Sequence, residues 1–414
     1  MVKRMHLLVM IALLVTLVVG LSMSNAQDDT LRIGVLTDQS GALAVYGFEQ
    51  TNGFELGLDY ATDGTMEIAG RPVEILVRDN GGDIDTALAD ARELIENEGV
   101  EILFGTVSST VTLNLQASAV EYDTILMAGP SATPAVTGDN FNVNTFRVCR
   151  NSFHDAFAIA SYAVNTYGTN YVQLAPDNAF GQGSAGAFDV GFAALGGEPI
   201  RDTILVADTT TDFTPAWTEV LDSGADFVAV TWAGASAADL FNQALDLGVF
   251  DEIGVVTGFN SNDVILALDA YPPGTAGLIV YHYTLPDNEV NDWLVEAHRE
   301  AYDGDVPDLF TECGFATAQA LVLALEETGG STLPEDMIPA LEGLEFDGPK
   351  GHYTIRPEDH QALMAMYVVE FTQLDTENFD FYTLLEEVSA EDSAPPCLAA
   401  GRGSDSLECP PAAE

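Results

Sequence analysis

Short apolar runs alternate with longer amphipathic stretches over most of the chain. The runs are continuous, which is typical of strands that are buried on both faces of a parallel sheet. In the first third of the chain, strands of this kind are predicted at Leu31–Leu36, Val73–Val77, Ile102–Phe104 and Ile125–Ala128. Helical periodicity lies between them, around Gln50–Ala61, Thr86–Glu98 and Ser109–Glu121. This order of strand and helix predicts βαβ units and therefore an α/β fold.

The same alternation resumes after a junction near Phe146–Asn151. Further strands are predicted at Tyr171–Leu174, Thr203–Val206, Phe227–Val230, Gly254–Val256 and Leu278–Tyr281. A strand pair follows at His352–Ile355 and Met364–Phe371. After Tyr382 the chain becomes acidic and then rich in Pro, Gly and Ser. The pattern therefore predicts two α/β halves followed by a tail.

Two polar turns follow neighbouring predicted strands within Ile102–Gly138. Ser108-Ser109-Thr110 come after the first strand, and Gly129-Pro130-Ser131-Ala132-Thr133 come after the second. If the strands are parallel neighbours, both turns lie at the edge where open α/β sheets bind ligands. Hydroxyls and free backbone N–H groups at a helix N-terminus suit a carboxylate. The alternative is that Ser109 and Thr110 only cap the helix.

These turns resemble those of a known family. The motif G-x-x-S-S-T at Gly105–Thr110, a buried strand, and G-P-S-A-T-P at Gly129–Pro134 are similar to the first lobe of the periplasmic leucine/isoleucine/valine-binding protein family. The segments Ile33–Gly47, Arg78–Asp83 and Asp177–Gly183 fit the same family, and the similarity covers roughly Leu31 to Phe371. Members of this family are solute receptors of ABC importers.

The resemblance implies a type I periplasmic-binding fold, in which two Rossmann-like lobes with parallel sheets are joined by a three-strand hinge. Later crossings between the lobes are expected near His282 and Phe346. Residues 27–150 and 283–345 then form the first lobe, and residues 151–282 and 346–386 form the second. Residues 387–414 are expected to form a C-terminal tail.

The resemblance also implies a ligand site between the lobes. Ser109 corresponds to the family serine that holds the ligand carboxylate through its hydroxyl and backbone N–H. Ser131 and Thr133 match the second turn, which completes this grip. Tyr46 matches the aromatic residue of the first loop. These residues are the first-lobe side of the expected site.

The second lobe is expected to contribute aromatic residues. Phe180 lies where the family usually has a tyrosine that closes over the ligand. Trp232 lies beside a second family tyrosine position, where strict alignment places Ala233. The alternative for Phe180 and Trp232 is an ordinary place in the hydrophobic core, because both are large apolar groups.

One departure from the family bears on the ligand. Amino-acid receptors of the family have a carboxylate after the strand that corresponds to Gly254–Val256, and it pairs with the ligand ammonium. Here Phe259 takes that place, and Asn260 offers an acceptor without charge. A buried ammonium without a partner is costly. Either another acid pairs with it, with Asp155, Asp177 and Glu312 as candidates, or the ligand has no ammonium.

The N-terminal segment has the pattern of a signal peptide. Lys3 and Arg4 precede an apolar core at Leu7–Leu21, and Ser24-Asn25-Ala26 is a small-residue cleavage site. We expect cleavage after Ala26 and a periplasmic location, with an uncleaved membrane anchor as the alternative. Residues 1–26 are therefore excluded from the fold.

Export permits disulfides, and the chain has four cysteines. Cys397 and Cys409 share the tail and are expected to pair there. The family fold could bring Cys149 and Cys313 together, and two free buried thiols are the alternative. The spacing C-x-x-C, which is typical of metal sites, is absent.

The charge of the chain excludes several partners. Its formal net charge is −52, with 13 Lys and Arg against 65 Asp and Glu among 414 residues. Nucleic acid and anionic membrane surfaces are excluded because both need basic patches. The acids are dispersed along the chain, which indicates a solvated acidic shell that suits a saline habitat.

An enzyme needs a nucleophile, an acid–base pair or a metal, and the sequence offers no such constellation. None of the six histidines lies in H-x-H or H-E-x-x-H. Gly181-x-Gly183-x-x-Gly186 matches the dinucleotide fingerprint only formally, because it lies in the second half of the fold. The turn Asp79–Asp83 lacks the ligand spacing of a calcium loop. No cofactor and no metal are therefore expected.

The sequence thus predicts an exported, non-enzymatic solute-binding receptor of an ABC importer. Two lobes close on a small carboxylate, and the importer membrane subunits are its partners. Hydrophobic or branched-chain amino acids are the leading ligand class, and aromatic or other organic acids without an ammonium are the alternative. A sensory ligand-binding module of the same fold is a further alternative. The protein is expected to be a monomer.

Overall fold

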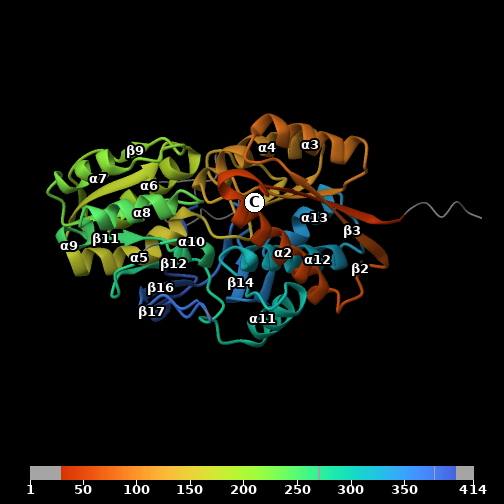
Figure 1. Cartoon of the computed structure of the whole chain (residues 1–414). Coiled ribbons are helices and arrows are strands. Elements are labelled where there is room, and N and C mark those ends of the chain that lie inside the picture. The colour runs from red at the N-terminus through yellow and green to blue at the C-terminus, as the bar shows by residue number, and fades with distance from the viewer. Residues whose placement is uncertain (1–28, 269–270, 377, 398–414) are drawn as a thin grey trace, which may run out of the picture.

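The computed structural model describes residues 29–268, 271–376 and 378–397, which form two α/β lobes side by side (Figure 1). The first lobe is built on a six-stranded sheet with the order β2-β3-β1-β4-β5-β6. All neighbours in this sheet are parallel except β2 and β3. The strands are β1 (Leu31–Thr37), β2 (Glu67–Ile68), β3 (Arg71–Asp79), β4 (Ile102–Gly105), β5 (Ile125–Ala128) and β6 (Thr145–Phe146).

Helices cover both faces of the first sheet. On one face lie α3 (Ile84–Glu96) and α4 (Ser109–Glu121). On the other face lie α2 (Ala44–Ala61), α12 (Thr311–Glu327) and α13 (Pro334–Leu341). Helices α2 and α12 approach so closely that a Cβ on Gly53 would lie 2.0 Å from the carbonyl oxygen of Thr311. Glycine at position 53 therefore sets the spacing of this helix pair, and with it the position of the start of α2.

The second lobe has a sheet with the order β11-β10-β7-β8, in which β9 also pairs with β7. Its strands are β7 (Asn170–Pro176), β8 (Glu198–Pro199), β9 (Ile204–Val206), β10 (Phe227–Val230) and β11 (Gly254–Thr257). One face is covered by α5 (Ser152–Tyr167) and α6 (Ala179–Ala193). The other face is covered by α7 (Thr214–Leu221), α8 (Ala237–Asp246), α9 (Val249–Glu252) and α10 (Asn262–Leu266).

An antiparallel sheet extends the second lobe. It has the order β12-β16-β17 and consists of β12 (Ala276–Ile279), β16 (Met366–Phe371) and β17 (Tyr382–Val388). Leu278, Met366, Val368 and Val388 join the same core as α5 and α6. After β12 the chain returns to the first lobe, where α11 (Glu289–Ala301) contacts α2.

The third crossing between the lobes lies later than predicted. A small sheet of β13 (Glu345–Gly348), β14 (Gly351–Ile355) and β15 (Ala362–Leu363) packs in the first-lobe core, together with α12 and α13. Met364 belongs to this core, whereas Met366 belongs to the second-lobe core. The crossing therefore lies between Met364 and Met366, and its predicted place near Phe346 is wrong.

The predicted strand pair is wrong for the same reason. The segment His352–Ile355 lies in β14, which pairs with β13 and β15, and the segment Met364–Phe371 contains β16, which pairs with β12 and β17. Tyr353 and Ile355 of β14 lie in the core that contains α12, and neither lies in the core that contains α5. A strand pattern shows which residues are buried but does not show which of two cores receives them.

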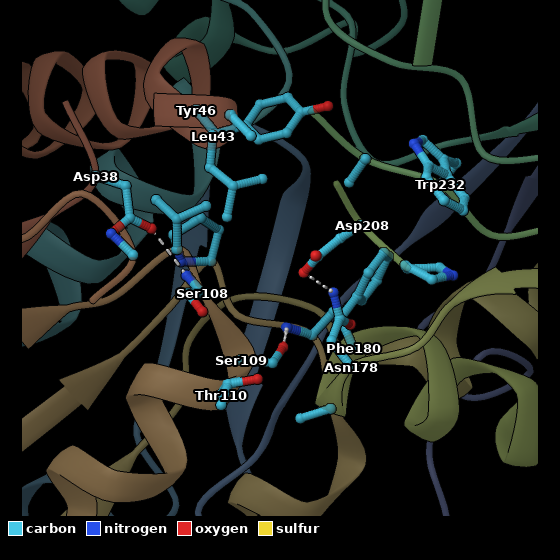
Figure 2. Close-up of a pocket in the computed structure, with 18 of the residues that line it drawn as sticks. Asp38, Leu43, Tyr46, Ser108, Ser109, Thr110, Asn178, Phe180, Asp208 and Trp232 are labelled. Carbon is cyan, nitrogen blue, oxygen red and sulfur yellow. Dashed lines mark hydrogen bonds between the residues drawn. The ribbon is translucent and has the colours of Figure 1, made fainter. Parts of the chain in front are cut away.

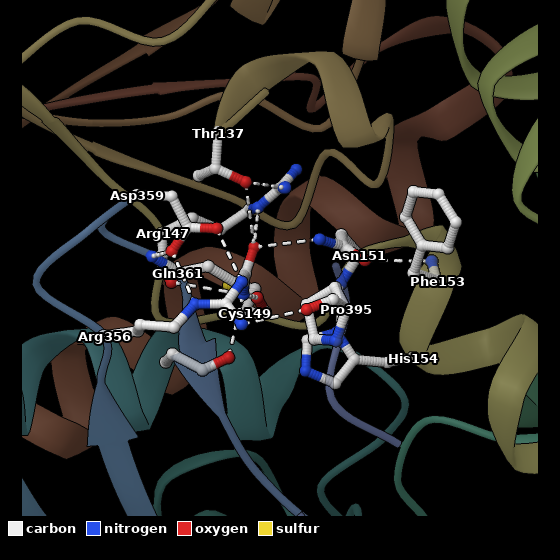
Figure 3. Close-up of polar contacts among 11 residues, drawn as sticks. Thr137, Arg147, Cys149, Asn151, Phe153, His154, Arg356, Asp359, Gln361 and Pro395 are labelled. Carbon is white, nitrogen blue, oxygen red and sulfur yellow. Dashed lines mark hydrogen bonds and ion pairs between the residues drawn. The ribbon is translucent and has the colours of Figure 1, made fainter. Parts of the chain in front are cut away.

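The first crossing is held by a buried arginine (Figure 3). Arg147 donates from Nε to Gln361 Oε1 at 2.7 Å and from Nη2 to Thr137 Oγ1 at 2.8 Å. Its Nη1 donates to the carbonyl oxygens of Thr133 at 2.8 Å and Ser131 at 3.3 Å. The guanidinium thus ties the first crossing to the turn after β5 and to the segment before the third crossing.

A disulfide joins Cys149, just after this arginine, to Cys313 in the first turn of α12, with a Cα–Cα distance of 5.1 Å. The alternative of two free thiols is thereby excluded for this pair. Cys409 lies outside the described residues, so the Cys397–Cys409 pair stays a prediction. The predicted signal peptide, residues 1–26, also lies outside the described residues.

Candidate functional site

A cavity of about 720 Å³ lies between the two lobes (Figure 2). Its first-lobe wall comes from the loop after β1, the start of α2 and the N-terminus of α4. Its second-lobe wall comes from the start of α6 and the loops after β9 and β10. These walls are the carboxyl ends of parallel strands, which is where the sequence predicts a ligand site.

Ser109 joins the two polar turns that the sequence singles out. Helix α4 begins there because Ser108 caps it, with Ser108 Oγ accepting the N–H of Val111 at 3.4 Å. The hydroxyl oxygen of Ser109 accepts the backbone N–H groups of Ala132 and Thr133, each at 3.2 Å. Its hydroxyl proton is left to donate, and Ser109 lines the cavity. Ser109 is thus placed to donate to an acceptor in the cavity at the positive end of the α4 dipole.

The side chains of Ser131 and Thr133 do not line this cavity. A Cβ on Gly183 in α6 would lie 2.6 Å from Thr133 Oγ1, so Thr133 points at the second lobe. Ser131 is buried, and its hydroxyl has no hydrogen bond to the described residues. The second turn therefore reaches the cavity through Pro130 and Ala132 rather than through the two predicted hydroxyls.

Tyr46 connects the lobes. It lies in α2, it is 2% exposed, and its hydroxyl donates to Asn260 Oδ1 at 2.8 Å. The same oxygen accepts the backbone N–H of Gly234 at 3.0 Å. Its ring packs edge-on against Phe310 with centroids 5.0 Å apart. Since Asn260 and Gly234 belong to the second lobe, these bonds hold the lobes in a closed arrangement.

Aromatic residues of the second lobe face Ser109 across the cavity (Figure 2). Phe180 lies at the start of α6, and Trp232 lies in the loop after β10, where its Nε1 donates to Ser236 Oγ at 3.0 Å. Ala233 also lines the cavity, in agreement with the strict alignment. The structure thus brings Phe180 and Trp232 to the site, although Trp232 is also packed against Phe213 in the core.

Phe259 and Asn260 line a smaller, adjoining cavity of about 60 Å³. Phe259 is 4% exposed and packs against Tyr271, Phe371 and Tyr382. Residues that line both cavities connect them: Tyr46, Arg150, Phe180, Trp232, Ala233 and Phe310. No carboxylate occupies the place of Phe259, as the sequence indicates.

The three acids proposed as partners for an ammonium lie in different surroundings. Asp155 lines the smaller cavity and pairs with Arg150. Asp177 is exposed at the rim of the larger cavity, where its Oδ1 accepts Gln182 Nε2 at 2.8 Å. Glu312 lines neither cavity and accepts the hydroxyl of the buried Tyr353. None of the three acids is therefore a buried carboxylate of the cavity wall that lacks a cation or hydrogen-bond donor and could pair with a ligand ammonium.

Sequence reasoning missed two charged residues of the site. Asp38 follows β1, and its carboxylate accepts the N–H groups of Gly82 at 2.8 Å and Ser108 at 3.0 Å. Burial raises the pKa of Asp38 to about 6, although these two hydrogen bonds act to lower it. Arg150 lies just after the first crossing and lines both cavities. Arg150 could have been predicted, because two arginines within four residues are unusual in a chain so poor in basic residues.

A pair of buried acids lies at the boundary of the lobes. Glu49 Oε2 in α2 accepts the N–H of Phe310 at 2.9 Å, and Asp308 Oδ2 accepts the N–H of Asn262 in the second lobe at 2.7 Å. Burial raises the pKa of Asp308 to about 7, and it raises the pKa of Glu49 in the same direction. Closing the lobes therefore favours uptake of protons here.

The fold agrees with the comparison to known families. Residues 30–376 match the family model for periplasmic binding proteins. The chain belongs to this family. It is a periplasmic-type solute-binding protein of an ABC transporter, with a type I fold.

Related binding proteins match this one over most of their length. The Leu/Ile/Val-binding protein homolog 6 of Brucella melitensis is 25% identical over 373 residues, which cover 88% of this chain and 93% of the relative. The crystal structure of an ABC-type branched-chain amino acid transporter from Rhodopseudomonas palustris is 32% identical, with a TM-score of 0.74, and covers 89% of this chain and 99% of its own. Another R. palustris solute-binding protein, in complex with 4-hydroxybenzoate, is 20% identical with a TM-score of 0.78 over 88% of this chain and 98% of its own.

Two further observations concern the described residues only. No helix within them is long and apolar enough to span a bilayer. Within the same ranges, no three side chains of His, Cys, Asp or Glu are grouped so that they could hold a metal ion.

Proposed function

We propose that this binding protein takes a small carboxylate with an apolar body into the cavity between its lobes. The observation that carries the proposal is the hydrogen bonding of the Ser109 hydroxyl. Its oxygen is occupied by two backbone N–H groups, and its remaining proton is free to donate at the start of α4. Such a donor at a positive helix end suits an anionic oxygen.

The rest of the cavity suits the apolar body of such a ligand. Leu43, Tyr46, Phe180, Trp232 and Phe310 line it. A small apolar acid would lose contact with water on these surfaces, and each aromatic face adds packing area. The lobes are closed by the bonds of Tyr46, so both lobes would contact a bound ligand.

Two ligand classes fit this description. Hydrophobic amino acids are suggested by the Brucella relative, whose name is Leu/Ile/Val-binding protein homolog, and by the branched-chain amino acid transporter of R. palustris. Aromatic acids are suggested by the R. palustris protein that binds 4-hydroxybenzoate. The place of Phe259 and the pairing of Asp155 with Arg150 favour the second class, because neither offers a free charge to an ammonium.

Ser109→Ala tests the proposal. Calorimetric titration with leucine, its 2-oxo acid and benzoate should first identify a class that binds the wild-type protein. The substitution should then weaken binding of that class about 10-fold to 150-fold, since a hydrogen bond to a charged group is worth about 1.5–3 kcal/mol. Ser161→Ala, on the exposed side of α5, is the matched control. An unchanged affinity of Ser109→Ala would contradict the carboxylate grip.

The remaining features of the proposal rest on the family and on the pattern of the N-terminal segment. The protein is expected to be exported, with cleavage after Ala26, and to deliver its ligand as a monomer to the membrane subunits of an ABC importer. It is expected to bind its ligand without changing it. Mass spectrometry of the secreted chain would test the cleavage site, and size-exclusion chromatography would test the monomer.

A further inference from the structure

Arg150 and Asp155 form an unusual pair in the wall shared by the two cavities. Arg150 is 7% exposed, and so is Asp155. Arg150 Nε and Asp155 Oδ1 lie 3.3 Å apart as an ion pair, yet both atoms are buried and neither has a hydrogen bond among the described residues. Buried polar atoms are nearly always hydrogen-bonded, so this pair needs a further partner.

The position of Arg150 leaves donors for such a partner. Its Nη1 donates to the carbonyl oxygen of Pro130 at 3.0 Å, and its guanidinium lies over the ring of Phe310 at 5.2 Å. Arg147, three residues earlier, uses all three of its nitrogens on protein acceptors. An arginine has five N–H donors, so Arg150 retains donors at the cavity wall.

The charges around Asp155 indicate what kind of partner fits. Burial raises the pKa of Asp155, and three cations act against this effect: Arg150, Lys350 and Arg147. An ammonium at Asp155 Oδ1 would add a fourth positive charge beside Arg150. A neutral hydroxyl avoids this repulsion, and it can accept from Arg150 while it donates to Asp155.

The geometry points to a ligand that carries a neutral hydroxyl on the side remote from its carboxylate. Ser109 lines only the larger cavity, and Asp155 lines only the smaller one. Between them lie the aromatic residues that line both: Tyr46, Phe180, Trp232 and Phe310. We therefore propose that the protein selects hydroxylated aromatic acids through the Arg150–Asp155 pair. This inference rests on the proposed carboxylate site.

Matched ligands test the inference on the wild-type protein. Benzoate, 4-hydroxybenzoate and 4-(aminomethyl)benzoate share the ring and the carboxylate, and they end in hydrogen, a hydroxyl and an ammonium group. Titration calorimetry should show that 4-hydroxybenzoate binds most tightly, benzoate less tightly and 4-(aminomethyl)benzoate least tightly. The hydroxyl should increase the affinity about 10-fold or more over benzoate, as a hydrogen bond to a charged group does. Equal affinities for the first two, or tightest binding of the ammonium compound, would overturn the inference.

A variant of the pair tests the residues. Asp155→Asn keeps the shape but removes the charge, and it should reduce the preference for 4-hydroxybenzoate over benzoate at least severalfold. Asp246→Asn, an exposed acid at the end of α8, is the control for the loss of one charge. An unchanged preference in Asp155→Asn would overturn the role of this pair. Should this variant fail to fold, the ligand series on the wild-type protein still decides the inference.

The two proposals fail in different ways. If benzoate binds and Ser109→Ala weakens it, but the hydroxyl adds nothing, only the Arg150–Asp155 inference is overturned. If neither amino acids nor aromatic acids bind to the wild-type protein, the carboxylate site itself is overturned.

Discussion

Tyr46→Phe should weaken ligand binding by loosening the closed arrangement of the lobes. The substitution removes one hydroxyl, which donates to Asn260 and accepts from Gly234. It keeps the ring and its packing against Phe310. When the lobes open, water can satisfy Asn260 and Gly234, so the loss is felt mainly in the closed form.

The size of the effect follows from the two bonds. Each buried hydrogen bond contributes about 0.5–1.5 kcal/mol net, so the closed form should lose about 1–3 kcal/mol relative to the open form. That change lowers the ratio of closed to open protein about 5-fold to 150-fold. If the free protein is mainly open, the apparent affinity for the ligand falls by the same factor.

Two measurements check this prediction. Titration calorimetry with an established ligand gives the affinity, and small-angle X-ray scattering at saturating ligand gives the compaction. Tyr122→Phe is the matched control, because the hydroxyl of Tyr122 donates to Glu96 within the first lobe and bridges nothing between lobes. If Tyr46→Phe binds and compacts like the wild-type protein, the bonds of Tyr46 do not govern closure, and the reasoning is refuted.

Two further predictions concern pH and the disulfide. Burial in the closed form raises the pKa of Asp308 to about 7, the neighbouring acids Asp263 and Asp305 raise it further, and Asp308 in turn raises the pKa of Glu49. Closure therefore takes up protons, so ligand affinity should fall as the pH rises from about 4 to about 7 and then level off. Titration calorimetry across this range measures how steeply the affinity depends on pH. The variant Asp308→Asn should make this dependence weaker. Cys149→Ser with Cys313→Ser opens a cross-link between residues 164 positions apart and should lower the free energy of unfolding by about 2–4 kcal/mol in a urea titration. A flat pH profile or an unchanged urea midpoint would contradict the respective prediction.

Much of the fold could be predicted from the sequence because its signals are local. Continuous apolar runs indicate strands that are buried on both faces, and β1, β4, β5, β7, β10 and β11 lie within a few residues of their predicted places. The serine and threonine turn at the start of α4 is equally local, because helix capping depends on a few neighbouring residues. The absence of an acid at Phe259 could also be read from the sequence alone.

The parts that could not be predicted depend on which surfaces meet. Tyr353 lies in a predicted strand and Phe346 lies at a predicted crossing between the lobes, but only packing against α12 places both in the first lobe. Thr133 reads as a ligand contact, but the approach of Gly183 in α6 turns its side chain toward the second lobe.

The sequence by itself determined the α/β class, the two halves and the start of α4 at Ser109, since each depends on residues that are close together in the chain. Tertiary structure alone decided the character of the pocket. Arg150 and Asp155 become candidate binding residues because they are buried together in the cavity wall. Tyr46 bonds to Asn260 only because α2 packs against a loop that lies 214 positions further along the chain. A buried ion pair with unsatisfied polar atoms is stabilised by a third hydrogen-bonding partner, and burial is a property of the folded chain.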